Sequence, residues 1–65
     1  MKITVNGTRT AVQATTLAEV VIELGHGGAK IATAVNECFV PATARATCAL
    51  ASGDRLEIVA PRQGG

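Results

Sequence analysis

The 65-residue chain has no tryptophan and no tyrosine, and Phe39 is its only aromatic residue. Hydrophobic residues still make up 48% of the sequence, most of them alanine, valine, isoleucine and leucine. A core built from this sequence must therefore be aliphatic. A chain of this length forms one domain at most and buries only about 60% of the surface that its unfolded form exposes, so its stability is marginal.

Cysteine and histidine are also scarce. Cys38, Cys48 and His26 are the only residues of these two types, and their spacing is not that of a zinc site, so we predict no metal. The sequence neighbours of the two cysteines do not favour a reactive thiolate, since Cys38 follows Glu37 and Cys48 has only Arg45 as a nearby cation. We expect both cysteines to be small packing residues and assign no catalytic role to His26.

The charged residues are few and mixed in sign, with a net charge of +1. Clustered basic residues, which nucleic acids and anionic membranes attract, are absent from the sequence. No apolar run reaches the length of a transmembrane helix, and the opening MKITVNGT lacks the apolar centre of a signal peptide. We therefore expect a cytoplasmic protein whose cysteines are thiols, with no nucleic-acid or membrane partner.

The first half of the chain predicts a hairpin and a helix. Ile3 and Val5 alternate with polar residues, and Asn6-Gly7 is a strong turn signal. The spacing then changes to a single helical stripe that consists of Leu17, Val20, Val21 and Leu24. Thr16 and Glu19, three residues later, form a capping box at the start of the helix, and Gly25 ends it.

The second half predicts more strands. Residues 30–41 read as two strands around a tight turn at Asn36-Glu37. The alanine-rich residues 42–51 favour a helical turn that Leu50 anchors, and residues 55–59 alternate as a last strand. The predicted order is therefore β-β-α-β-β-β.

This order and five stretches of sequence resemble the ThiS family, the sulfur carriers of thiamine biosynthesis. The stretches are ITVNG, TTLAEVVIELG, AVNECFVP, SGDRLEIV and the final QGG. The resemblance implies an α+β fold of the ubiquitin-like β-grasp type, with a mixed sheet of about five strands and one main helix packed across one face. It implies a β-grasp domain over residues 1–60 and a flexible C-terminal diglycine tail over residues 61–65.

The resemblance places the chemistry at Gly65. The α-carboxylate of a terminal residue is ionised at neutral pH, with a pKa of about 3.3–3.7, and is a poor electrophile until it is activated. In the family an E1-like adenylyltransferase uses ATP to adenylylate this carboxylate. A sulfur-donating protein then supplies the sulfur of a thiocarboxylate, which thiazole synthase consumes. The resemblance thus implies a carrier that is not an enzyme and binds no cofactor.

The rest of the tail suits this role. Pro61 has no N–H and discourages further strand pairing. The five residues beyond Ala60 can span about 17 Å, enough to reach a recessed active site. Gly64 would let enzyme groups approach the terminal carbonyl closely, and Arg62 and Gln63 are predicted tail contacts.

Phe39 and Val59 are predicted to dock partners. If Val40 and Ile58 face the helix, strand alternation turns Phe39 and Val59 to the opposite face of the sheet. The alternative is a different register that places Phe39 in the core. Other functions also stay open: a carrier for molybdopterin or cysteine synthesis, a ubiquitin-like modifier that is joined to lysine, a plain binding module, or a terminal diglycine without a role.

Overall fold

The computed structural model describes residues 1–60. Within them, strands and helical segments follow in this order: β1 (Lys2–Val5), β2 (Thr8–Ala11), α1 (Leu17–Glu23), β3 (Ala32–Val35), β4 (Cys38–Val40), the 3-10 helix η1 (Ala42–Thr47) and β5 (Arg55–Val59). The order predicted from the sequence is confirmed.

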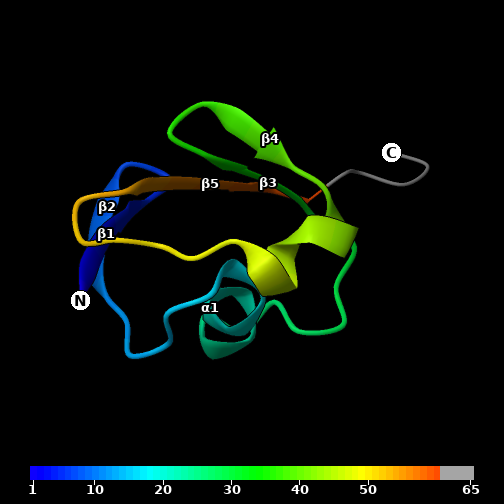
Figure 1. Cartoon of the computed structure of the whole chain (residues 1–65), viewed down its shortest axis with the longest axis horizontal. Helices are drawn as coiled ribbons and strands as arrows, with labels where there is room; N and C mark the ends of the chain where they lie inside the picture. The colour runs from blue at the N-terminus through cyan, green and yellow to red at the C-terminus, as the bar shows by residue number, and fades with distance from the viewer. Residues whose placement is uncertain (61–65) are drawn as a thin grey trace.

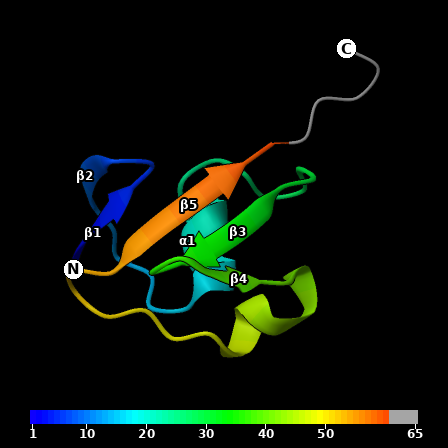
Figure 2. The same cartoon turned by 90° about the horizontal axis from the view of Figure 1, so that it is seen from above.

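The strands form one sheet in the order β2-β1-β5-β3-β4. β1 pairs with β5 in parallel, and the other neighbours are antiparallel. Figure 1 shows α1 lying across one face of this sheet, and Figure 2 shows β5 between β1 and β3. The predicted α+β β-grasp architecture is confirmed: a mixed five-stranded sheet with one main helix on one face.

Both hairpins turn on an asparagine with a left-handed backbone. Asn6 and Gly7 have φ of 50° and 85°, and Asn36 and Glu37 have φ of 51° and 70°. Two successive residues of positive φ match the twist of the flanking strands, which is why Asn-Gly favours such turns. The turns predicted at both places are confirmed, the second with a glutamate where glycine is usual.

Helix α1 begins and ends where the sequence predicts. The hydroxyl of Thr16 accepts a hydrogen bond from the Glu19 amide at 3.4 Å, and Gly25 follows the helix with φ of 93°. A helix of seven residues is marginal in water, so its stability comes from the buried side that faces the sheet. Leu17 and Val20 lie on that side and are fully buried.

Glu23 joins α1 to the segment that precedes it. Its carboxylate accepts hydrogen bonds from the Gln13 amide at 3.0 and 3.1 Å and from the Ala14 amide at 2.9 Å. These main-chain bonds, with the Ala14 bond as the larger cause, lower the pKa of Glu23 below the ordinary value of 4.5. The sequence pattern did not indicate this contact.

The core is aliphatic, as predicted. Its buried hydrophobic residues are Ile3, Val12, Leu17, Val20, Val21, Leu50, Leu56 and Ile58. Thr33 is buried with them, and its hydroxyl donates to the Val40 carbonyl at 2.8 Å. Arg45 reaches back from η1, donating from Nε to the Thr33 hydroxyl at 3.0 Å and from Nη2 to the Ile31 carbonyl at 2.7 Å. These bonds hold η1 against β3.

The expectation that both cysteines pack is wrong for Cys38. Cys48 is half-buried against the core, but Cys38 is exposed. Cys38 pairs with Val35 and so shares its face, yet it lies next to the hairpin turn on β4, one of the two edge strands of the sheet. Alternation assigns a residue to a face, but the elements packed on that face decide its burial.

In residues 1–60 no helix is long and apolar enough to cross a membrane.

Candidate functional site

The candidate site is built on the sheet face that α1 does not cover. β5 places Leu56 and Ile58 in the core, so the alternating residues Arg55, Glu57 and Val59 face the other way. Val59 is 61% exposed although it is a large hydrophobic residue. It ends β5 and lies one residue before Ala60, the last residue that the structure describes.

Phe39 shares this face. In the sheet register Ala34 lies between Phe39 on β4 and Glu57 on β5, and Ala32 pairs with Val59. Phe39 is 67% exposed. The two alanines have short side chains, so Phe39 and Val59 project beyond them. We call these four residues, Ala32, Ala34, Phe39 and Val59, the outer patch.

The outer patch differs from the rest of the described surface because large exposed apolar side chains are concentrated there. Three large hydrophobic side chains are exposed in residues 1–60, and the outer patch holds two of them, while Ile22 lies on α1. Scattered exposed hydrophobic residues are ordinary, but a group of them marks a surface that binds a partner. The prediction that Phe39 and Val59 leave the core is confirmed, and their docking role stays a prediction.

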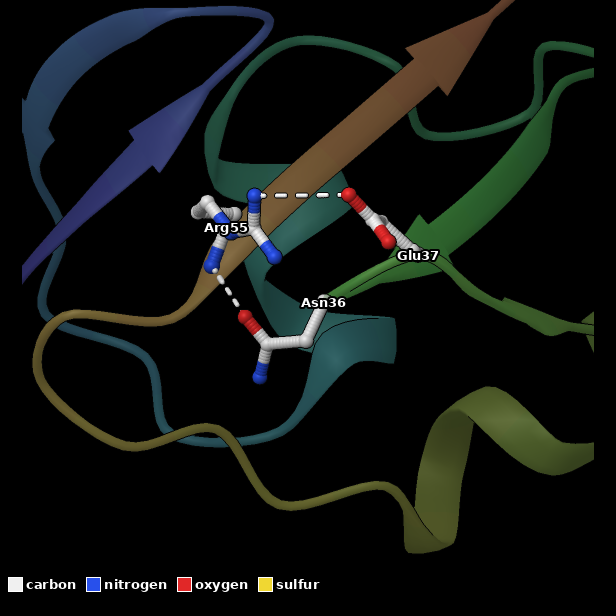
Figure 3. A network of polar contacts seen from close by, with 3 residues as sticks. All are labelled: Asn36, Glu37 and Arg55. Atoms are coloured by element: carbon white, nitrogen blue, oxygen red, sulfur yellow. Dashed lines mark hydrogen bonds and ion pairs between the residues drawn. The ribbon is translucent and has the colours of Figure 1, made fainter.

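Charged side chains border the outer patch at the start of β5. Arg55 forms an ion pair with Glu37 at 3.6 Å, as Figure 3 shows. Both side chains are well exposed, so the pair contributes only about 0–1 kcal/mol to stability. A shallow hollow beside it is lined by Thr4, Gly7, Glu37, Arg55, Leu56 and Glu57. Glu57 has no ion-pair partner among residues 1–60.

Two asparagines hold β5 at its two ends, and sequence reasoning missed both roles. The Asn36 Oδ1 accepts from the Arg55 amide at 2.9 Å, a contact also drawn in Figure 3. The Asn6 Oδ1 accepts from the Ile58 amide at 2.8 Å, and the Asn6 Nδ2 donates to the Ile58 carbonyl at 3.2 Å. The sequence showed these asparagines only as turn residues, because the contacts join segments that are far apart in the chain.

The described residues offer little chemistry of their own. Residues 1–60 contain no group of three or more side chains that could hold a metal ion. Cys38 and Cys48 are free thiols. His26 is half-buried in the segment after α1, where its main chain accepts from the Ala29 amide. The arrangement leaves an exposed apolar surface, the outer patch, on the face that carries the end of β5.

The predicted tail residues lie outside the described part of the chain. Arg62, Gln63, Gly64 and Gly65 are among them, as is Pro61. Their predicted roles as contacts and as the modified residue therefore stay predictions. What the structure describes is the place from which the tail starts, directly after Val59 and Ala60 beside the outer patch.

Comparisons with known proteins agree on one family and one fold. The model of the ThiS family matches residues 3–65. The chain is also similar in structure to a thiamine biosynthesis protein (ThiS) from Geobacter metallireducens. The TM-score is 0.85, with 23% sequence identity and 100% coverage of both chains. A comparison with curated protein sequences gives no match.

Proposed function

The chain belongs to the ThiS family, and from this membership we propose that it is a sulfur carrier for thiamine biosynthesis. The reactive group is the α-carboxylate of Gly65, at the end of the residues that follow β5. The observation that carries the proposal is the match of the family model through residue 65, which includes the two final glycines. The carrier works in the cytoplasm, where Cys38 and Cys48 stay reduced.

The first step is activation by an E1-like adenylyltransferase. A carboxylate oxygen of Gly65 attacks the α-phosphorus of ATP, a new C(O)–O–P linkage forms, and pyrophosphate leaves with the electron pair of the broken P–O bond. The mixed anhydride that results has AMP as a good leaving group. The chain itself supplies only the carboxylate, so the step needs no catalytic side chain from residues 1–60.

The second step places sulfur on the same carbon. A hydrosulfide equivalent from a sulfur-donating protein attacks the carbonyl carbon of Gly65, and AMP leaves with the electrons of the C–O bond. Loss of a proton from sulfur gives the thiocarboxylate, which is ionised at neutral pH. Thiazole synthase then takes the sulfur from this group for thiazole formation.

The outer patch docks the chain on these enzymes. Phe39 and Val59 are large and exposed, and Val59 lies one residue before Ala60, so an enzyme that covers the outer patch also receives residues 61–65. Aromatic residues in a desolvated contact carry much of the affinity of an interface. Arg62 and Gln63 contact the enzyme along its channel, and Gly64 leaves room around the terminal carbonyl.

Mass spectrometry of the intact chain tests the proposal. After incubation with the adenylyltransferase, ATP and a sulfur source, the chain should gain the mass difference between sulfur and oxygen. A chain that lacks Gly64 and Gly65 should stay unchanged, because it ends in a different carboxylate at a shorter reach.

Two results would contradict the proposal. One is conversion of the shortened chain at the rate of the intact chain, which would move the chemistry away from Gly65. The other is the appearance of covalent adducts between the chain and lysines of other proteins, without a thiocarboxylate, which is the result expected of a ubiquitin-like modifier.

A further inference from the structure

The parallel pairing between β1 and β5 is extended by a side chain. Two backbone hydrogen bonds link the β1 segment to the β5 segment in order along the chain. The Thr4 amide donates to the Asp54 carbonyl at 2.9 Å, and the Asn6 amide donates to the Leu56 carbonyl at 2.9 Å. A continued strand would place its next backbone partner opposite Ile58, because parallel pairing repeats every second residue.

The backbone of β1 cannot reach that position. It turns away at Asn6 and Gly7, whose φ values of 50° and 85° start the hairpin. The Asn6 side chain takes over instead, accepting from the Ile58 amide at 2.8 Å and donating to the Ile58 carbonyl at 3.2 Å. An amide group carries an acceptor and a donor side by side, as a strand backbone does, so it satisfies both groups of Ile58.

This contact lies at the point where β5 ends. Ile58 is two residues before Ala60, and on the other side of β5 the pairing with β3 reaches Val59 and Ala32. β5 is thus held on both sides almost to the last described residue. Without Asn6, the pairing on the β1 side would end at Leu56.

We propose that Asn6 is a positioning residue for the tail: its side chain fixes the point from which residues 61–65 reach into the adenylyltransferase. The inference rests on the proposed function, because it concerns delivery of Gly65 after docking. A longer loose segment lowers the effective concentration of its end at a fixed site and widens the range of its orientations. Loss of the Asn6 contact should therefore slow activation more than it weakens docking.

Asn36 offers a matched control. It also begins a hairpin turn, with φ of 51°, and its side chain and main chain bond to Arg55. Because β3 is antiparallel to β5, this contact lies at the start of β5, away from the tail. Asn6→Gly removes the two side-chain hydrogen bonds to Ile58. Asn36→Gly also removes two, the bond from the Arg55 amide and the bond that Nδ2 donates to the Asp54 Oδ1 at 3.1 Å. Glycine accepts the positive φ, so neither change strains the turn.

The test combines amide hydrogen exchange with activation kinetics on the full chain. In Asn6→Gly, exchange at the Ile58 amide should rise about fivefold or more, while Asn36→Gly should raise exchange at Arg55 instead. With the adenylyltransferase encoded in the same genome and ATP, pyrophosphate release at saturating carrier should fall about three- to tenfold for Asn6→Gly. Its binding constant should stay near that of the natural chain, and Asn36→Gly should turn over normally.

A further variant separates positioning from folding. Asn6→Asp keeps the turn and the acceptor for the Ile58 amide but loses the donor to the Ile58 carbonyl, so its turnover should lie between the natural chain and Asn6→Gly. Equal turnover of Asn6→Gly and Asn36→Gly overturns the inference, as does unchanged exchange at Ile58. Failure of the natural chain to be adenylylated is a different result, which overturns the proposed function and the inference together.

Discussion

At the scale of single residues, exposure separates three hydrophobic side chains from the rest of the described chain. Phe39 and Val59 lie on the outer patch, and Ile22 lies on α1, which packs on the opposite face of the sheet. Their exposed fractions are similar, at 67%, 61% and 64%. They therefore allow a comparison in which surface position changes while exposure does not.

Phe39→Asp should weaken binding to the adenylyltransferase about tenfold or more, because a charge replaces an aromatic anchor in a contact that excludes water. The change should leave folding nearly intact, since the side chain is 67% exposed. Calorimetric titration of the enzyme with the carrier measures the affinity, and thermal unfolding monitors the fold.

Ile22→Asp is the matched control for this change. It introduces the same charge at an equally exposed hydrophobic position of α1, and it should bind with normal affinity. Equal affinities of the two variants, with both folded, would show that the outer patch does not dock the enzyme.

At the scale of elements, short helices and strands depend on contacts made beyond their own residues. α1 has seven residues, and Glu23 at its end ties it to the amides of Gln13 and Ala14. η1 has no buried residue of its own and is held by Arg45 through Thr33 and Ile31. Each of these contacts joins an element to a segment that the local pattern alone does not link to it.

The contact of Glu23 makes folding stability depend on pH. Its pKa is lowered in the folded chain, so the ionised form stabilises the fold at pH values above the unfolded value of 4.5. This contribution is lost as the pH falls below 4.5 through the lowered folded pKa. Urea unfolding from neutral pH to well below 4.5 should show the loss, and Glu23→Gln should reduce the slope of stability against pH.

Glu57→Gln is the control for the pH dependence. Glu57 is exposed on β5, and its carboxylate accepts no hydrogen bond from residues 1–60. Comparison of the two variants assigns a change in slope to the main-chain bonds that Glu23 accepts and Glu57 does not. A Glu23→Gln variant with an unchanged slope would argue against the contribution of the two main-chain bonds.

At the scale of the whole molecule, one small aliphatic core joins α1 to the central strands β1 and β5. Leu17 is fully buried at the start of α1, and its amide also donates to the Cys48 carbonyl at 2.8 Å. A core of this size supplies no more than about 3–5 kcal/mol of net stability in a chain below 70–80 residues. Single core positions therefore matter more here than in a larger domain.

Leu17→Ala should leave the chain largely unfolded at ambient temperature. The loss of a buried leucine costs about 2–5 kcal/mol, which is comparable with the whole stability expected of the domain. Circular dichroism with urea titration measures the effect. Ile22→Ala, at an exposed position of the same helix, should shift the midpoint little. A Leu17→Ala variant that unfolds cooperatively at nearly the same urea concentration as the natural chain would contradict this expectation.

Much of this protein can be predicted from its sequence. Periodicity placed the strands and α1, Asn6-Gly7 and Asn36-Glu37 marked the turns, and alternation turned Phe39 away from the core. These features depend on backbone preferences and spacing within a few residues, so they can be read locally. The role of Gly65 as the modified residue has a different basis, family resemblance, and it stays a prediction because Gly65 lies outside the described residues.

Only the tertiary structure decided which segments meet. The last strand, β5, lies in the middle of the sheet, which brings Ile58 to Asn6 across 52 residues. The same folding leaves Cys38 exposed on an outer strand and buries Thr33 beneath Arg45. The local sequence pattern predicts which face of a strand or helix a side chain occupies. Which residues then surround that side chain depends on long-range contacts, because these bring distant segments together around one core.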